Sequence, residues 1–273
     1  MFDLPRLFYN DLIRESTISH NNVYWRSVES CKNERNKLNR LFVINDIINF
    51  TIMLNSKVFS FLKEIKENND REWFQANKPF FDDANRNVKL CAQQLFEELK
   101  FRNDLDDYKV FRIYRDVRFS KDKSPYKNHF GIAFHRQKPN FRGGYYLHIT
   151  PDESFLGIGF WGPSKDDLFR IRKEIEMYPD EFQAVVTEKG LIKNFGVLQG
   201  EQLKKAPKGF DPTHPGINYL RFKQLIFIQK IGDHQLMNDS FSDWMEYQFE
   251  VIRPFLNYMS EILTTDLNGE PLP

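Results

Sequence analysis

The sequence predicts an α+β protein with a mostly antiparallel meander sheet over about 109–161, covered on one face by helices from the N- and C-terminal parts. Three observations lead to this fold class. Apolar residues recur every three or four positions in 79–100 and 240–264, as on one face of a helix. Between 108 and 162 the period shortens to two, as in a strand with one buried face. The links between these strands are short, which favours antiparallel neighbours because a parallel crossover needs a longer connection.

The composition is that of an ordinary globular protein, with 41% hydrophobic and 28% charged residues in 273. Its two cysteines, Cys31 and Cys91, are too few for a disulfide scaffold, so we expect a reducing compartment and a cytoplasmic protein. The most apolar segment, 41–54, includes Asn45 and Asp46 and is shorter than the roughly 20 apolar residues of a membrane span. We therefore expect no membrane partner.

The chain divides by composition near Met53. Residues 1–52 are rich in asparagine and lack a clear period, so we interpret them as an N-terminal extension or an upstream read-through, with Met53 as the natural start. We predict a single α+β domain over 53–264 and a tail at 265–273.

The first helices of this domain follow from caps and apolar spacing. Ser56 can cap a short helix, and the Asn-Asn-Asp run at 68–70 ends it and can cap the next turn. A long helix then covers about 79–100, with a proline in its first turn, where proline is tolerated. Cys91 falls on the apolar face of that helix, so we place it in the core.

The middle of the chain predicts four strands. They cover 109–119, 129–136, 144–150 and 154–161. In each strand one set of alternate residues is apolar, and helices are needed to cover that side. The other set is polar or small, and these residues must share the opposite side of the sheet.

Helical spacing returns after the strands. The predicted segments are a helix at 164–177, a helix at 179–189, an ordered loop at 196–216 and an amphipathic helix at about 240–264. Ser164 caps the first of these helices, and Pro254 is expected to kink the last one. The segment 220–231 fits either a strand or a helix, because its periodicity does not decide between them.

The polar side of the predicted sheet carries the candidate site. Its polar and aromatic residues are Arg112, Tyr114, Asp116, Arg118, His129, His135, Tyr146 and His148. Its small residues are Gly131, Ala133, Gly157 and Gly159. Because glycine weakens a strand, these residues indicate either a pocket floor or a second helix layer packed tightly against them. Arg115 falls on the apolar side, where it needs a partner such as Glu72 unless a bulge turns it outward.

The net charge of +1 hides an uneven distribution. Segment 109–142 holds ten Lys and Arg against two acids, a local charge of +8, and 193–230 holds seven against two, or +5. The C-terminal stretch 239–273 instead has seven acids against one arginine. A basic centre favours an anionic ligand, since arginine binds phosphate or carboxylate with two parallel hydrogen bonds and lysine adds a point charge.

We predict that this surface binds a phosphorylated small molecule or a nucleotide. The candidate ligand-binding residues are Arg112, Arg115, Arg118, Lys123, Lys127 and Lys208. Should the protein be an enzyme, Asp116 would orient a guanidinium or act as a base, and Tyr126 and His148 would transfer protons. The competing explanation is a solvated charged surface without a ligand.

The same stretch carries a motif. Residues 112–127 contain R-x-x-R-D-x-R-F-x-x-x-K-x-P-Y-K, and N-N-x-R-E-W-F starts at Asn68, Y-Y-L-H at Tyr145 and L-x-x-A-P-K-G-F at Leu203. Together these motifs resemble the family called domain of unknown function 2461, over roughly 56–260. The resemblance implies no established activity, cofactor or catalytic residue, and the cofactor stays unknown.

Two other functions stay open. A non-catalytic nucleic-acid-binding protein would use the same basic surface with Lys204, Lys205 and Lys208, because cationic grooves with aromatic rings bind single strands. Such a protein would bind nucleic acid without catalysing a reaction. Oligomeric state is not decided by the sequence.

The second alternative is a metal-dependent enzyme. Its ligands would come from His129, His135 and His148 together with Asp116. No H-E-x-x-H or similarly tight spacing is present, so these histidines are weak candidates and we assign no metal.

Overall fold

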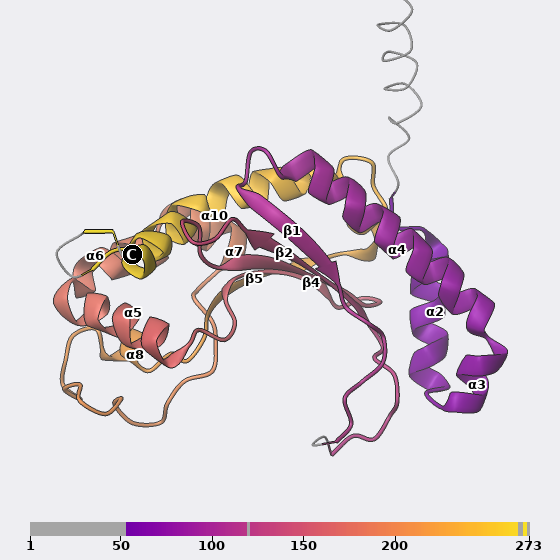
Figure 1. Cartoon of the computed structure of the whole chain (residues 1–273), viewed down its shortest axis with the longest axis horizontal. Coiled ribbons are helices and arrows are strands. Elements are labelled where there is room, and N and C mark those ends of the chain that lie inside the picture. The colour runs from indigo at the N-terminus through magenta and orange to yellow at the C-terminus, as the bar shows by residue number, and fades with distance from the viewer. Residues whose placement is uncertain (1–52, 119–120, 267–269, 272–273) are drawn as a thin grey trace, which may run out of the picture. The chain divides into compact units, whose positions relative to one another are not determined.

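The computed structural model describes residues 53–118, 121–266 and 270–271, and the predicted extension at 1–52 lies outside the described residues. Five antiparallel strands form one open sheet and follow each other in chain order (Figure 1). The strands are β1 (Leu105–Val110), β2 (Phe130–Arg136), β3 (Gly144–Ile149), β4 (Ser154–Phe160) and β5 (Leu225–Ile231). The predicted α+β class and antiparallel meander are therefore confirmed, and the undecided segment 220–231 contains an edge strand.

The bounds predicted for the first strand, 109–119, are wrong. β1 ends at Val110, and the chain then leaves the sheet and pairs with a later part of the same excursion, through a bridge between Tyr114 and Tyr126. We call this excursion, residues 111–118 and 121–128, the arm. Alternation of polar and apolar residues predicts extended backbone, but it does not identify the partner strand. The candidate residues Arg112, Asp116 and Arg118 thus lie on the arm and not on the sheet.

Helices flank this sheet. They are α2 (Ser56–Glu67), α3 (Arg71–Ala76), α4 (Lys78–Leu99), α5 (Lys165–Met177), α6 (Pro179–Val186), α7 (Lys189–Phe195), α8 (Ile217–Leu220), α9 (Asp233–Leu236) and α10 (Phe241–Thr264). The segment predicted as one helix at 179–189 is divided, because Glu188 begins a new helix by accepting a hydrogen bond from the Leu191 N–H, 2.9 Å away.

The helix caps follow the sequence with one exception. Asp70 accepts from the Trp73 N–H at 2.8 Å and Ser164 from the Asp167 N–H at 3.0 Å, as predicted. The cap of α2 is Asn55 and not Ser56, because the Asn55 side chain accepts the Val58 N–H. An asparagine and a serine in adjacent positions are both good caps, so composition did not separate them.

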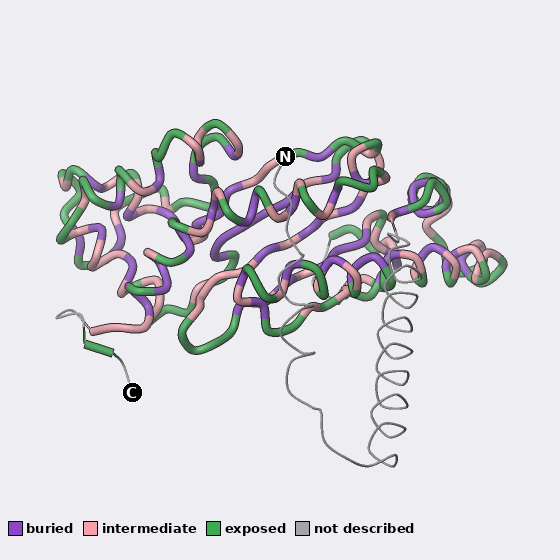
Figure 2. Tube along the Cα trace, turned by 90° about the horizontal axis from the view of Figure 1, so that it is seen from above, coloured by how far each residue is buried: buried purple, intermediate pink, exposed green. Residues whose placement is uncertain are grey.

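One face of the sheet is covered by helices from both ends of the described chain (Figure 1). The ring of Tyr145 on β3 stacks on Phe249 of α10, with centroids 3.6 Å apart, and Phe61 of α2 lies 6.2 Å from Phe130 of β2. Figure 2 shows buried and exposed residues alternating along these elements, as amphipathic patterns require. Cys91 is buried on α4, and burial raises the pKa of its thiol to about 12.

Arg136 is one of the ten basic residues of segment 109–142, and its role is structural. Its side chain is buried on the helix side of β2, where it donates to the Asn257 side chain at 2.7 Å and the Arg142 carbonyl at 3.2 Å. Burial lowers the pKa of this guanidinium. Arg136 therefore ties the end of β2 to α10. None of the helices described in 53–118 and 121–266 has the length and apolarity needed to cross a membrane.

We expect Phe249→Ala to destabilise the fold by about 3–5 kcal/mol, because it deletes a fully buried ring that joins α10 to β3. The control is Tyr247→Ala on the same helix, where the side chain is 50% exposed and the expected change is within about 0.5 kcal/mol. Urea denaturation followed by circular dichroism measures both. Equal effects of the two substitutions would contradict this packing.

Candidate functional site

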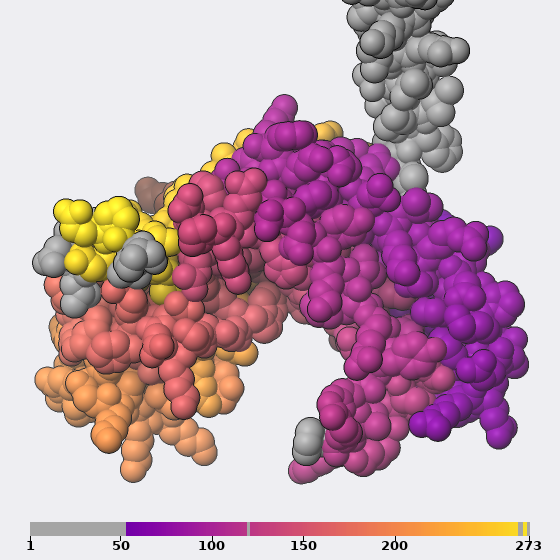
Figure 3. All heavy atoms as spheres, viewed as in Figure 1, coloured from indigo at the N-terminus to yellow at the C-terminus, as the bar shows by residue number. Residues whose placement is uncertain are grey.

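The face of the sheet opposite α4 and α10, which we call the open face, carries the candidate site. Figure 3 shows the described part of the chain hollowed on this side, between the arm and the segment 196–216. Two cavities lie here. One extends along β3 and β4, and the other lies where the arm meets the sheet.

Aromatic rings fill the space beside two of the glycines of the open face. A Cβ atom at Gly131 would lie 2.5 Å from the Tyr146 hydroxyl, and one at Gly157 would lie 2.1 Å from the Trp161 ring. These glycines therefore let rings lie against the sheet, an arrangement that neither a bare pocket floor nor a second helix layer describes. Gly159 has another role, since its φ is +131° and its Cα approaches the Leu225 carbonyl of β5.

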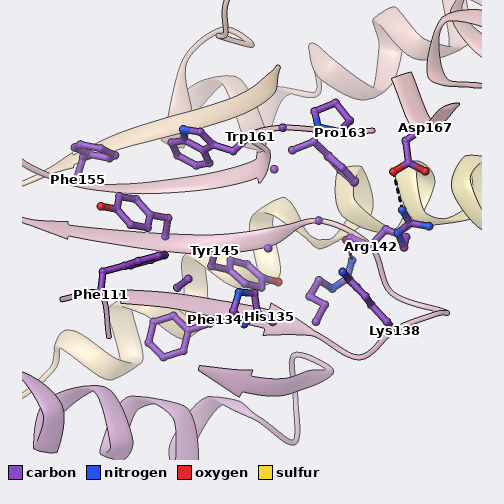
Figure 4. A pocket seen from close by; sticks show the side chains of 18 residues that line it. Phe111, Phe134, His135, Lys138, Arg142, Tyr145, Phe155, Trp161, Pro163 and Asp167 are labelled. Carbon is purple, nitrogen blue, oxygen red and sulfur yellow. Dashed lines mark hydrogen bonds and ion pairs between the residues drawn. The ribbon is translucent and has the colours of Figure 1, made fainter. Parts of the chain in front are cut away.

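The cavity along β3 and β4 has a volume of about 590 Å³, and we call it the aromatic groove. Its aromatic side chains from the open face are Phe111, Tyr146, Phe155 and Trp161. Charged groups lie at its other end, where Arg142 donates to Asp167 at 2.9 Å beside Lys138 (Figure 4). A ligand in this groove would contact aromatic rings at one end and the Arg142–Asp167 ion pair at the other.

The second cavity has a volume of about 610 Å³ and is lined almost entirely by polar groups, and we call it the arm pocket. It is lined by Lys66, Asn69, Arg115, Asp116, Asp122, Ser124, Tyr126, Lys127, Asn128 and His129. Most of these residues come from the arm. Lys66 and Asn69 come from α2 and the turn after it and were not singled out by the sequence, although Asn69 belongs to the N-N-x-R-E-W-F motif.

Acidic neighbours hold two arginines of the arm in place. Arg118 donates two hydrogen bonds to Asp116, at 2.9 and 2.6 Å, and these bonds hold the pKa of that carboxyl below its usual range. Arg115 pairs with Asp122 and not with Glu72, the partner that the sequence suggested. Hydrogen bonds from Ser124, followed by the bond from Arg115, lower the pKa of Asp122 to about 2.

Lys127 and Arg112 form the cationic centre of the arm. Lys127 is half-buried, and burial followed by repulsion from Arg112 and Arg115 lowers the pKa of its amine. Its ammonium lies 5.6 Å from the centre of the Phe111 ring, which places it between the arm pocket and the aromatic groove. Arg112 is exposed. An anion beside these groups would relieve their repulsion.

The other predicted cations lie farther out. Lys123 is exposed and donates to the Val117 carbonyl at 2.9 Å, within the arm. Lys208 is exposed on the segment 196–216, across the hollow from the arm (Figure 3). The structure thus brings Arg115, Asp116 and Lys127 into one cavity and leaves Lys208 on the opposite wall.

Tyr126 anchors the arm. It is 3% exposed and stacks on Phe74 of α3, with centroids 4.0 Å apart. The Asn69 side chain donates to the Tyr126 carbonyl at 3.0 Å and accepts from its N–H at 3.1 Å. Burial raises the pKa of the Tyr126 phenol. These contacts are those of a core residue that fixes the arm to α3.

Two of the three candidate histidines lie together. The rings of His129 and His148 are 4.2 Å apart, and the Tyr146 hydroxyl lies 3.4 Å from His148 Nδ1. Burial lowers the pKa of both; for His129, repulsion from His148 and Lys127 adds to the effect and the pKa falls to about 4. Both rings are therefore neutral near pH 7.

His135 does not join them. It lies near the other end of β2 and contacts Asp107 of β1 at 2.5 Å. Within residues 53–118, 121–266 and 270–271, no three His, Cys, Asp or Glu side chains gather in a way that could hold a metal ion. The metal-dependent alternative thus gains no support from the described geometry.

The fold and the open face together define an α+β protein with a helix-backed antiparallel meander and an exposed face that combines an aromatic groove with a basic pocket. The family model described as "Conserved hypothetical protein (DUF2461)" matches residues 57–258, and the chain belongs to this family. The family resemblance found in the sequence is thereby confirmed. Comparisons with curated proteins and with solved structures found no match.

We expect Asn69→Ala to release the arm, because it removes both hydrogen bonds to the Tyr126 backbone. The expected loss of stability is about 1–2 kcal/mol. Limited trypsin digestion should cut faster at the arm's lysines and arginines, as read by mass spectrometry. Asn68→Ala is the control, since the Asn68 side chain donates only to the Glu64 carbonyl of its own helix. Unchanged cleavage in Asn69→Ala would contradict the anchoring role.

The depressed pKa of His129 predicts a loss of stability in mild acid. Because the folded state holds this ring neutral, stability is full above the ordinary pKa of 6.5 and declines as the pH falls toward about 4. Between pH 6.5 and pH 4 the free energy of unfolding of His129→Asn should therefore fall by about 1 kcal/mol less than that of the wild type, after allowance for the partial exposure of the ring. Urea midpoints between pH 7 and pH 4 measure this. His234→Asn, at an exposed position on α9, should keep the wild-type slope.

Proposed function

We propose that the open face binds an anionic, phosphorylated ligand, a small molecule or a nucleotide, with its phosphate beside Lys127 and Arg112, where the arm pocket borders the aromatic groove. The observation that carries the proposal is that Arg115 and Lys127 line one polar cavity with Arg112 nearby; burial, followed by repulsion from the two arginines, lowers the pKa of the half-buried lysine. Cations held near each other repel, and this repulsion costs free energy. A bound phosphate attracts each of them and offsets that cost.

Each cation has a role that suits its surroundings. Arg112 and Lys127 contact the phosphate, since a guanidinium offers paired donors and an ammonium offers a point charge. Arg115, which pairs with Asp122, lines the arm pocket and adds positive charge to this region.

Groups outside this centre serve other parts of the ligand. Lys123 adds positive charge to the arm, and Lys208 meets the distal part of a ligand long enough to cross the hollow. The aromatic groove takes an apolar or planar portion, because Phe111, Tyr146 and Trp161 gather at the end away from the Arg142–Asp167 ion pair.

We assign no reaction to the site. If the bound ligand reacts, His148 is our choice for proton transfer, because its ring is neutral and contacts the Tyr146 hydroxyl. Asp116 orients Arg118, and we leave Tyr126 out because it is buried against Phe74. We also propose a cytoplasmic location, from cysteine usage alone.

Inorganic pyrophosphate, titrated into the full-length protein at low salt in a calorimeter, tests the proposal. The wild type should bind it, and Arg112→Ala and Lys127→Met should each weaken binding about tenfold or more, because each removes a charge-assisted contact. Arg86→Ala, at an exposed position on α4 behind the sheet, should not change the affinity. Absence of wild-type binding, or equal weakening by Arg86→Ala, overturns the proposal.

A further inference from the structure

We infer that the ligand of the open face is a single strand of nucleic acid, which runs from the arm pocket into the aromatic groove. The inference rests on the proposed function and names the class of its ligand. Four features of the open face lead to it, namely a row of rings, their accessibility, the charge around them and the length of the row.

Ring contacts connect the two cavities. The Trp161 and Tyr146 rings have centroids 5.6 Å apart, those of Tyr146 and His148 are 6.0 Å apart, and those of His148 and His129 are 4.2 Å apart. Trp161 and Tyr146 line the aromatic groove, and His129 lines the arm pocket. We call these four rings the ring row. A polymer whose units each carry a planar ring and a phosphate matches a row of rings that begins at a cationic pocket.

Trp161 and Tyr146 are the rings of this row that are placed to stack with a ligand, whereas His148 lies between His129 and Phe155, with centroids 4.2 and 4.6 Å away. Trp161 is 39% exposed although one edge of its ring occupies the space left by Gly157, so the indole is supported from below and open above. Tyr146 is supported in the same way by Gly131. Stacking of this kind is tolerant of sequence, because every base has a π-face.

The charge around the rings complements a phosphate backbone, since the two aspartates that line the arm pocket, Asp116 and Asp122, are paired with arginines. The central strands β2, β3 and β4 contain no aspartate or glutamate. The arm supplies cations on one side of the hollow, and Lys204, Lys205 and Lys208 are exposed residues of the segment 196–216, which lies on the other side (Figure 3). Cations on both sides of a neutral aromatic floor form the groove that tracks a backbone in single-strand binders.

The length of the row separates a strand from a mononucleotide. A single base stacks on one ring, so a mononucleotide on Trp161 or Tyr146 leaves the other ring and one of the two cavities empty. A duplex is also excluded from this row, because its bases stack on each other and do not expose their faces.

The experiment uses full-length protein and a fluorescein-labelled oligothymidine of about 12 nucleotides, a length within single-strand site sizes. Fluorescence anisotropy gives its affinity at several salt concentrations. We expect the log–log slope against salt to be about −3, since each of about four neutralised phosphates contributes about −0.7 for single strands. An unlabelled duplex of the same length should compete poorly.

Substitutions then separate stacking from charge. Trp161→Ala should weaken oligothymidine binding about tenfold without changing the salt slope or the affinity for inorganic pyrophosphate, and Trp161→Phe should restore most of the affinity. Arg112→Ala should weaken both ligands and make the slope less steep by about 0.7. Tyr247→Ala, which removes a more exposed ring from α10, should change nothing.

Two outcomes overturn the inference while the proposed function stands: pyrophosphate binds but oligothymidine binds no more tightly, or Trp161→Ala leaves oligothymidine binding unchanged. Equal competition by the duplex overturns it as well. If neither pyrophosphate nor oligothymidine binds, the proposed function fails together with the inference.

Discussion

The open face depends on how the arm is held against α3. The two hydrogen bonds between the Asn69 side chain and the Tyr126 backbone, and the stack of Tyr126 on Phe74, join segments more than fifty positions apart. Arg112, Arg115 and Lys127 are carried by this arm, so their position relative to the sheet follows from that anchor. Without it, the same cations would be solvated separately and would not repel each other.

The two faces of the sheet differ in how the space next to the strands is filled. On the helix side, rings and aliphatic chains interdigitate with α10 and α4, and burial of this apolar surface is the main stabilising contribution. On the open face, Gly131 and Gly157 have no side chains, and the rings of Tyr146 and Trp161 therefore lie against the backbone. Tyr146 is half-buried in this arrangement and Trp161 stays 39% exposed.

The arm and the C-terminal helix carry charges of opposite sign. The acids of the C-terminal part, including Asp243, Glu250 and Glu261, are exposed on α10 in the helix layer. The exposed cations of the arm and of the segment 196–216 border the open face instead. A near-zero net charge therefore coexists with a local excess of positive charge on the arm.

The sequence by itself determined the strands β2, β3 and β4, the long helices, most of the caps and the basic character of the centre, because these features arise from local periodicity and composition. Only the tertiary structure decided the partner of the arm, the acid that pairs with Arg115 and the rings that occupy the glycine spaces. A period of two specifies an extended backbone with two faces, but it leaves the neighbouring segment unspecified. That choice is made by long-range contacts such as the one between Asn69 and Tyr126, which no local pattern encodes.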